Sequence, residues 1–157
     1  MTLASCDSRK TAGENPFFTE WDTPHGVPPF DKILPEHFMP AFERGMSLHE
    51  AEIDAITSNN DEPTFENTIL AYDNAGQMLA QTELIFGMLC AAETNERMQA
   101  LQEQVMPLLS AHRDKIRLDE KLFARVKDVY DRRASLGLDA EQSRLLRKTY
   151  DAFVRSG

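Results

Sequence analysis

At 157 residues, with 17 Lys and Arg against 26 Asp and Glu, the chain has the length of one ordinary domain and a formal net charge of -9. That charge disfavours nucleic acid and anionic membrane surfaces as partners, since both carry the same sign. No window approaches the ~18 apolar residues of a membrane span. From the length we expect a single domain with its own buried core.

Residues 1–14 are small and polar without periodicity, and we interpret them as a mobile terminus. Within them, Leu3-Ala4-Ser5-Cys6 is similar to the lipobox of bacterial lipoproteins, in which the cysteine is lipidated. Too few residues precede Cys6 for a charged region and an apolar stretch, so either a signal peptide has been trimmed away or the match is a coincidence. A membrane partner is expected only if Cys6 is lipidated, and the compartment stays open between bacterial cytoplasm and cell envelope.

A proline-punctuated aromatic stretch begins at Asn15. Its apolar members are Pro16, Phe17, Phe18, Trp21, Pro24, Pro28, Pro29 and Phe30. Each proline removes a hydrogen-bond donor and restricts the residue before it, which argues against a helix. The stretch is too apolar for a free linker, so we predict an extended strap whose aromatic rings lie against the helices that follow.

Helical periodicity then continues to the end of the chain. The first helix is predicted from Pro35 to about Ser58, with an apolar stripe of Phe38, Phe42, Met46, His49, Ile53 and Ile56. A second, longer helix is predicted from Pro63-Thr64 to about Glu93. Its Gly76 and Gly87 each cost about 1 kcal/mol relative to alanine, which suggests close approach of a neighbouring helix at both points.

Three further helices follow after breaks in this periodicity. Thr94 and Asn95 recap the chain before a third helix through Met98 and Ile116, with a bend expected at Pro107. Asp119 caps a fourth that should end at Gly137. Asp139 and Gln142 form a capping box for a fifth, with Leu146, Tyr150 and Phe153 facing inward. The short connections favour antiparallel neighbours, so the predicted fold is an all-α antiparallel bundle of about five helices preceded by the strap.

The chain carries few residues with the spacing of an active site. His49-Glu50 opens the zinc-peptidase pattern His-Glu-x-x-His, but Ile53 occupies the position of the second histidine. His49 and His112 lie on apolar stripes, where a histidine is usually a hydrogen-bonded member of the core. Cys90 lies in an apolar run, which is typical of an inert buried thiol. We therefore predict no catalytic, cofactor-binding or metal-binding residue in the chain.

Several longer segments follow one another in a fixed order along the chain. The first group comprises Asn15-Pro16-Phe17, Pro28-Pro29-Phe30-Asp31-Lys32-Ile33, Phe38-Met39-Pro40-Ala41 and Pro63-Thr64-Phe65-Glu66-Asn67-Thr68-Ile69. The second comprises Pro107-Leu108-Leu109-Ser110-Ala111-His112, Leu122-Phe123-Ala124-Arg125-Val126 and Leu136-Gly137-Leu138-Asp139-Ala140-Glu141-Gln142. In their number and order these segments resemble the opening of the bacterial peptidyl-dipeptidases in the thimet oligopeptidase family of zinc peptidases, although no segment is a catalytic motif.

The resemblance implies that residues 15–157 are the amino-terminal helical domain of a larger enzyme that releases C-terminal dipeptides from oligopeptides. Family members use a zinc ion held by a His-Glu-x-x-His helix and a distal glutamate, and no position of this chain takes those roles. The whole enzyme would hold zinc and an oligopeptide substrate. This inactive part would form a wall of the substrate channel, with the missing catalytic domain as its partner.

Gly157 falls in mid-sequence by this comparison, so we expect a truncated piece of the enzyme. The alternative hypothesis is a free-standing helical interaction module, with a lipid anchor at Cys6 as an optional addition. Complete helix caps and a length adequate for independent folding favour that alternative.

Overall fold

The computed structural model describes residues 15–92 and 95–155, which form helices and loops without a strand. The predicted mobile terminus with Cys6, the Thr94 half of the predicted recap, and Gly157 lie outside the described residues. The longer helices are α1 (Pro35–Thr57), α3 (Gln77–Ala92), α4 (Glu96–Arg117), α5 (Glu120–Asp131) and α6 (Ala140–Val154). The predicted all-α bundle is confirmed for the described residues.

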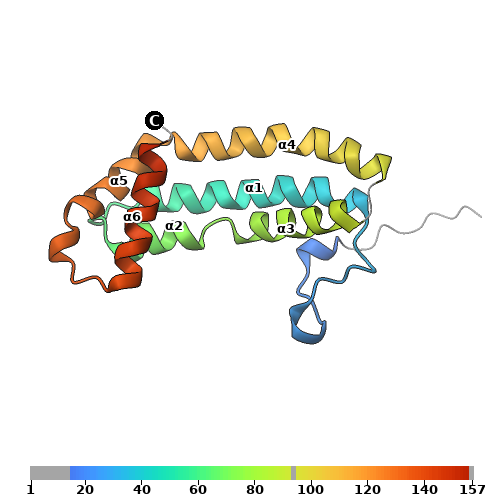
Figure 1. Ribbon diagram of the computed structural model, residues 1–157, viewed down its shortest axis with the longest axis horizontal. Helices are drawn as coiled ribbons and strands as arrows, with labels where there is room; N and C mark the ends of the chain where they lie inside the picture. The colour runs from blue at the N-terminus through green and yellow to red at the C-terminus, as the bar shows by residue number, and fades with distance from the viewer. Residues whose placement is uncertain (1–14, 93–94, 156–157) are drawn as a thin grey trace, which may run out of the picture.

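Three long helices lie side by side in one part of the molecule (Figure 1). The helix α3 runs antiparallel to α1, because Phe86 near the end of α3 contacts Phe42 near the start of α1. The helix α4 runs in the same direction as α1, because Glu36 pairs with Arg97 at one end and Glu50 pairs with Lys115 further along. Helices α5 and α6 turn across the end of this layer where α1 and α4 finish.

The predicted second helix is interrupted, so its prediction as one continuous element was wrong. A turn of π-helix, η3 (Phe65–Leu70), leads into the short α2 (Ala71–Asn74), and α3 starts only after a break at Ala75 and Gly76. Gly76 has φ of 75°, a left-handed value that glycine adopts without a steric penalty. The apolar periodicity continues through this break, which is why the pattern alone predicted a single helix.

The capping predictions at the helix starts are confirmed where they rest on described residues. Side chains of Asn95, Asp119 and Asp139 each accept a hydrogen bond from the backbone N–H three residues on. The predicted end of the fourth helix at Gly137 was wrong. Helix α5 ends at Asp131, and a 3-10 turn, η4 (Arg133–Ser135), continues toward Gly137.

The buried side chains form two cores along the length of α1 and α4. The first core contains Phe17, Ile33, Phe38, Ala41, Phe42, Leu79, Ile85, Phe86, Met98, Val105 and Leu109. The second core contains Ile53, Ile56, Phe65, Ile69, Ile116, Leu122, Val126, Val129, Leu146 and Phe153. Both α1 and α4 contribute to both cores, so these two helices connect the halves of the molecule.

The strap packs against the first core as predicted. Phe17 is buried with its ring centroid 5.3 Å from that of Phe38, and Trp21 and Phe30 are partly buried beside it. The strap is not extended throughout, since it contains the 3-10 turns η1 (Pro16–Phe18) and η2 (Pro24–Gly26). Asn15 ties it to α1 by donating a side-chain hydrogen bond to the backbone oxygen of His37.

Candidate functional site

Two histidines meet between the two cores. His49 on α1 and His112 on α4 lie with Nδ1 of the first 3.0 Å from Nε2 of the second, so that one ring donates an N–H to the other. The side chain of His112 is only 3% exposed, and that of His49 is half-buried. These residues are 63 positions apart in sequence, so a search for paired imidazoles on one helix does not find them.

Charged side chains surround this histidine pair. Glu50 Oε1 lies 3.5 Å from His112 Nδ1, beyond good hydrogen-bonding distance, while its Oε2 lies 2.8 Å from Lys115 Nζ. The hydrogen bond from Lys115 holds the pKa of Glu50 below its ordinary value. Burial, and then the electrostatic effect of the neighbouring His112, lower the pKa of His49, although Glu52 and Glu50 oppose the shift.

The break between α2 and α3 packs directly on the same pair. The backbone N–H of Gly76 donates to Glu52 Oε2 at 2.6 Å. A Cβ built on Gly76 would lie 2.9 Å from His49 Nδ1. The predicted close approach at Gly76 therefore exists, but the contact is with the His49 ring. At Gly87 a Cβ would have nothing within 4 Å, so the same prediction was wrong there.

The histidine pair does not have the chemistry of a zinc site. Its two nearest nitrogens face each other, Glu50 is engaged by Lys115, and Glu52 by the Gly76 N–H. Across residues 15–92 and 95–155, no group of three or more His, Cys, Asp or Glu side chains is arranged to hold a metal ion. Since zinc sites need at least three protein ligands, the residues here do not fit one.

Cys90 shows no sign of activation as a nucleophile. Its side chain is half-buried beside the first core, and this burial raises the pKa of the thiol. A reactive cysteine needs the opposite shift, toward thiolate at neutral pH.

Arg125 on α5 is a buried anchor that the sequence did not reveal. Its Nη1 donates to the backbone oxygens of Asn59 and Asp61 at 2.7 and 3.2 Å, and its Nη2 donates to Asn67 Oδ1 at 3.2 Å. Asn67 in turn caps the η3 turn together with Thr64. One guanidinium therefore joins α5 to the loop after α1 and to the π-helical turn, which indicates a structural role.

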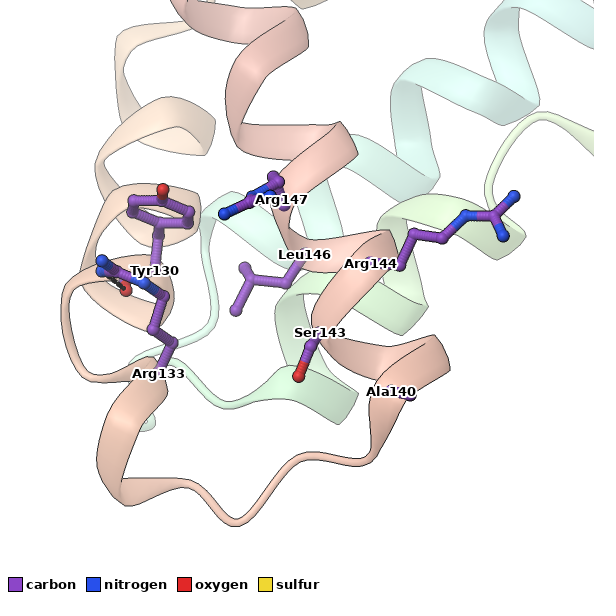
Figure 2. A pocket seen from close by; sticks show the side chains of 7 residues that line it. All are labelled: Tyr130, Arg133, Ala140, Ser143, Arg144, Leu146 and Arg147. Atoms are coloured by element: carbon purple, nitrogen blue, oxygen red, sulfur yellow. Dashed lines mark hydrogen bonds between the residues drawn. The ribbon is translucent and has the colours of Figure 1, made fainter.

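A cavity of about 430 Å³ between α5 and α6 is a second feature beyond the reach of sequence patterns (Figure 2). Three arginines line it with four smaller or apolar residues. These seven are Tyr130, Arg133, Ala140, Ser143, Arg144, Leu146 and Arg147. They come from the end of α5, the η4 turn and the first turns of α6, so only the folded chain brings them together.

The sequence of this chain is similar to segments of known bacterial peptidases. No protein-family model matches the chain. Over 143 residues, 91% of its length, the chain is 42% identical to dipeptidyl carboxypeptidase of Escherichia coli strain K12 and 38% identical to that of Salmonella typhimurium. The chain matches a segment of the dipeptidyl carboxypeptidase family. Oligopeptidase A of E. coli is a more distant relative of this segment, at 24% identity over 135 residues.

This peptidase-family segment covers only 21% of the length of the two dipeptidyl carboxypeptidases. The zinc that the resemblance implies for a whole enzyme finds no fitting set of ligands in the described part of the segment. In the same part, no helix combines the length and the hydrophobicity that crossing a bilayer requires.

Proposed function

We propose that this chain is the amino-terminal helical domain of a zinc-dependent peptidyl-dipeptidase that releases C-terminal dipeptides from oligopeptides. In that enzyme it forms part of the wall of the substrate channel and carries no catalytic group. The observation that supports this most is the 42% identity that spans 91% of the chain but 21% of the relative. The hydrogen bond between His49 and His112 joins two helices, which supports a structural role for this pair.

A segment exchange tests the proposal. The homologous segment of E. coli dipeptidyl carboxypeptidase is replaced by residues 15–157, and hydrolysis of a blocked tripeptide is measured. We expect the chimera to keep dipeptide release, because a domain of equivalent shape restores the channel wall. A folded chimera without activity contradicts the proposal.

The isolated chain provides the complementary measurement. We expect no stoichiometric zinc by metal analysis and no hydrolysis with zinc added, because the described residues offer no three-ligand site. Metal-dependent turnover by the isolated chain overturns the proposal. The alternative of a module anchored through Cys6 has no supporting observation in the structure, since Cys6 lies outside the described residues.

A further inference from the structure

We propose that the cavity between α5 and α6 binds a small oxyanion, a phosphate or a carboxylate, between Arg133 and Arg147. This inference is independent of the peptidase assignment, because it rests only on residues of this segment. The volume of about 430 Å³ falls within the range of small-molecule sites.

One arginine is held in place on the α5 side of the cavity. The Arg133 guanidinium lies 4.2 Å from the centroid of the Tyr130 ring, and its Nη1 donates to the Tyr130 backbone oxygen at 2.7 Å. The Tyr130 ring is itself stacked on Tyr150, with centroids 3.8 Å apart and planes 3° from parallel. A guanidinium fixed in this way loses less conformational entropy when it binds an anion than a free side chain would.

The opposite wall supplies the second positive charge. Arg147 extends from α6 toward Tyr130, whereas the guanidinium of Arg144 points away from the cavity (Figure 2). The hydroxyl of Ser143 lies on the same wall and offers a further donor. Two guanidinium groups and a hydroxyl around an apolar floor of Leu146 match the donor set that binds carboxylate and phosphate oxygens.

The cavity lining contains no Asp or Glu, and several acidic side chains near its residues in sequence or on neighbouring elements are engaged elsewhere. Asp131 pairs with Lys127, and Asp128 and Glu62 pair with Arg132. The Asp139 carboxylate accepts from the Gln142 N–H at the start of α6. Within the described ranges no carboxylate pairs with Arg133 or Arg147, although the chain carries a net charge of -9. The cavity therefore has a local positive charge that an anion would neutralise.

The arrangement of the Tyr130 and Tyr150 rings restricts the class of anion that the cavity can bind. Tyr150 covers one face of Tyr130, and the Arg133 guanidinium lies over the ring as well, so neither face is open to a nucleobase. Without a stacking surface, recognition rests on charge and hydrogen bonds, which favours a compact anion over a nucleotide.

Calorimetric titration of the full chain with inorganic phosphate, pyrophosphate or glutarate tests the site. Ionic strength is kept at about 150 mM, so that charges beyond roughly 8 Å are screened and only the local guanidinium groups contribute. We expect saturable binding of one anion per chain. Preference for pyrophosphate identifies a phosphoryl group as the ligand, and preference for glutarate identifies a carboxylate. The absence of saturable binding by all three anions at millimolar concentrations overturns the proposal.

Variants that differ only in one charge locate the binding. We expect Arg147→Gln and Arg133→Gln each to weaken binding about tenfold or more, because each removes charge-assisted hydrogen bonds to the anion. Lys148→Gln is the matched control on the same helix, and we expect less than about a twofold effect because Lys148 is exposed and does not line the cavity. Equal weakening in all three variants contradicts the site, since it indicates a general response to net charge. All of these side chains are exposed, so circular dichroism should show the same helical content in each variant.

Discussion

Gly76 lies where backbone conformation and packing both restrict the side chain. Its φ is 75°, and a Cβ would lie 2.9 Å from His49 Nδ1. We expect Gly76→Ala to lower the free energy of unfolding by about 1–3 kcal/mol, because alanine is strained at this φ and must displace the imidazole. Urea denaturation followed by the helical circular dichroism signal measures the change.

Gly87 is the matched control for this prediction. It lies at an exposed position within α3, where an added Cβ would have nothing within 4 Å. Gly87→Ala should therefore raise the free energy of unfolding by about 0.5–1 kcal/mol, since alanine is the better helix former. If both substitutions act in the same direction, the structural distinction between the two glycines is incorrect.

The pKa of His49 predicts how stability changes with pH. Burial and then the electrostatic effect of His112 lower this pKa from its ordinary value of 6.5, so the unfolded chain binds the proton more readily than the folded chain. The stabilising effect of neutral His49 is complete above about pH 6.5 and is lost as pH falls from there toward the folded pKa. We expect the urea midpoint to fall with pH over this window.

The variant His49→Gln should show a shallower fall of the midpoint in the same window, because glutamine does not titrate. His25→Asn is the control, since His25 is exposed and its φ of 61° is one that asparagine tolerates. If the urea midpoint of His49→Gln falls with pH as steeply as that of the unmodified chain, the histidine pair is not the cause of the pH dependence.

Among the helical elements, α5 is joined to the η3 turn by the buried Arg125 guanidinium in addition to the packing of the second core. We expect Arg125→Met to lower the free energy of unfolding by about 2–4 kcal/mol, because two backbone oxygens and the Asn67 side chain lose a buried cationic donor. Lys127→Gln, at an exposed pair with Asp131 one turn apart, should change it far less. Chemical denaturation compares them, and equal losses would mean that Arg125 is not an anchor.

The sequence predicted those parts of the elements that local chemistry determines. Asp119 and Asp139 cap helices by accepting from a backbone N–H three residues on, so their role is readable from short spacing. The break at Gly76 was not readable, because glycine inside an apolar period is compatible with both a helix and a left-handed turn. The contact that selects the turn comes from His49, which lies much earlier in the sequence and on another helix.

Contacts between residues far apart in the sequence also explain which features of the candidate sites the sequence did not predict. His49 and His112 were each predicted to be core histidines, and His112 is buried, but their partnership depends on α1 and α4 running in the same direction. Arg125 and the arginine-lined cavity likewise depend on how α5 meets its neighbours. Periodicity indicates which face of a helix is buried but not which residue of another helix it meets.

At the scale of the whole molecule, α1 and α4 cross from the first core to the second, with the histidine pair between them. Breaking either core exposes one half of each helix, so we expect both halves to unfold in one cooperative transition. The intrinsic chromophores report on the halves separately. The single tryptophan, Trp21, packs on the first core, and the three tyrosines, Tyr72, Tyr130 and Tyr150, pack on the second.

Tryptophan fluorescence and tyrosine near-ultraviolet circular dichroism should therefore give coincident urea transitions for the unmodified chain. Two separated transitions would mean that the polar contacts of His49 and His112 do not couple the cores, and that each half is stable by itself. Coincidence is expected because a helix of 23 residues that is continuous through both cores cannot lose packing on one half without losing hydrogen-bonded turns shared with the other.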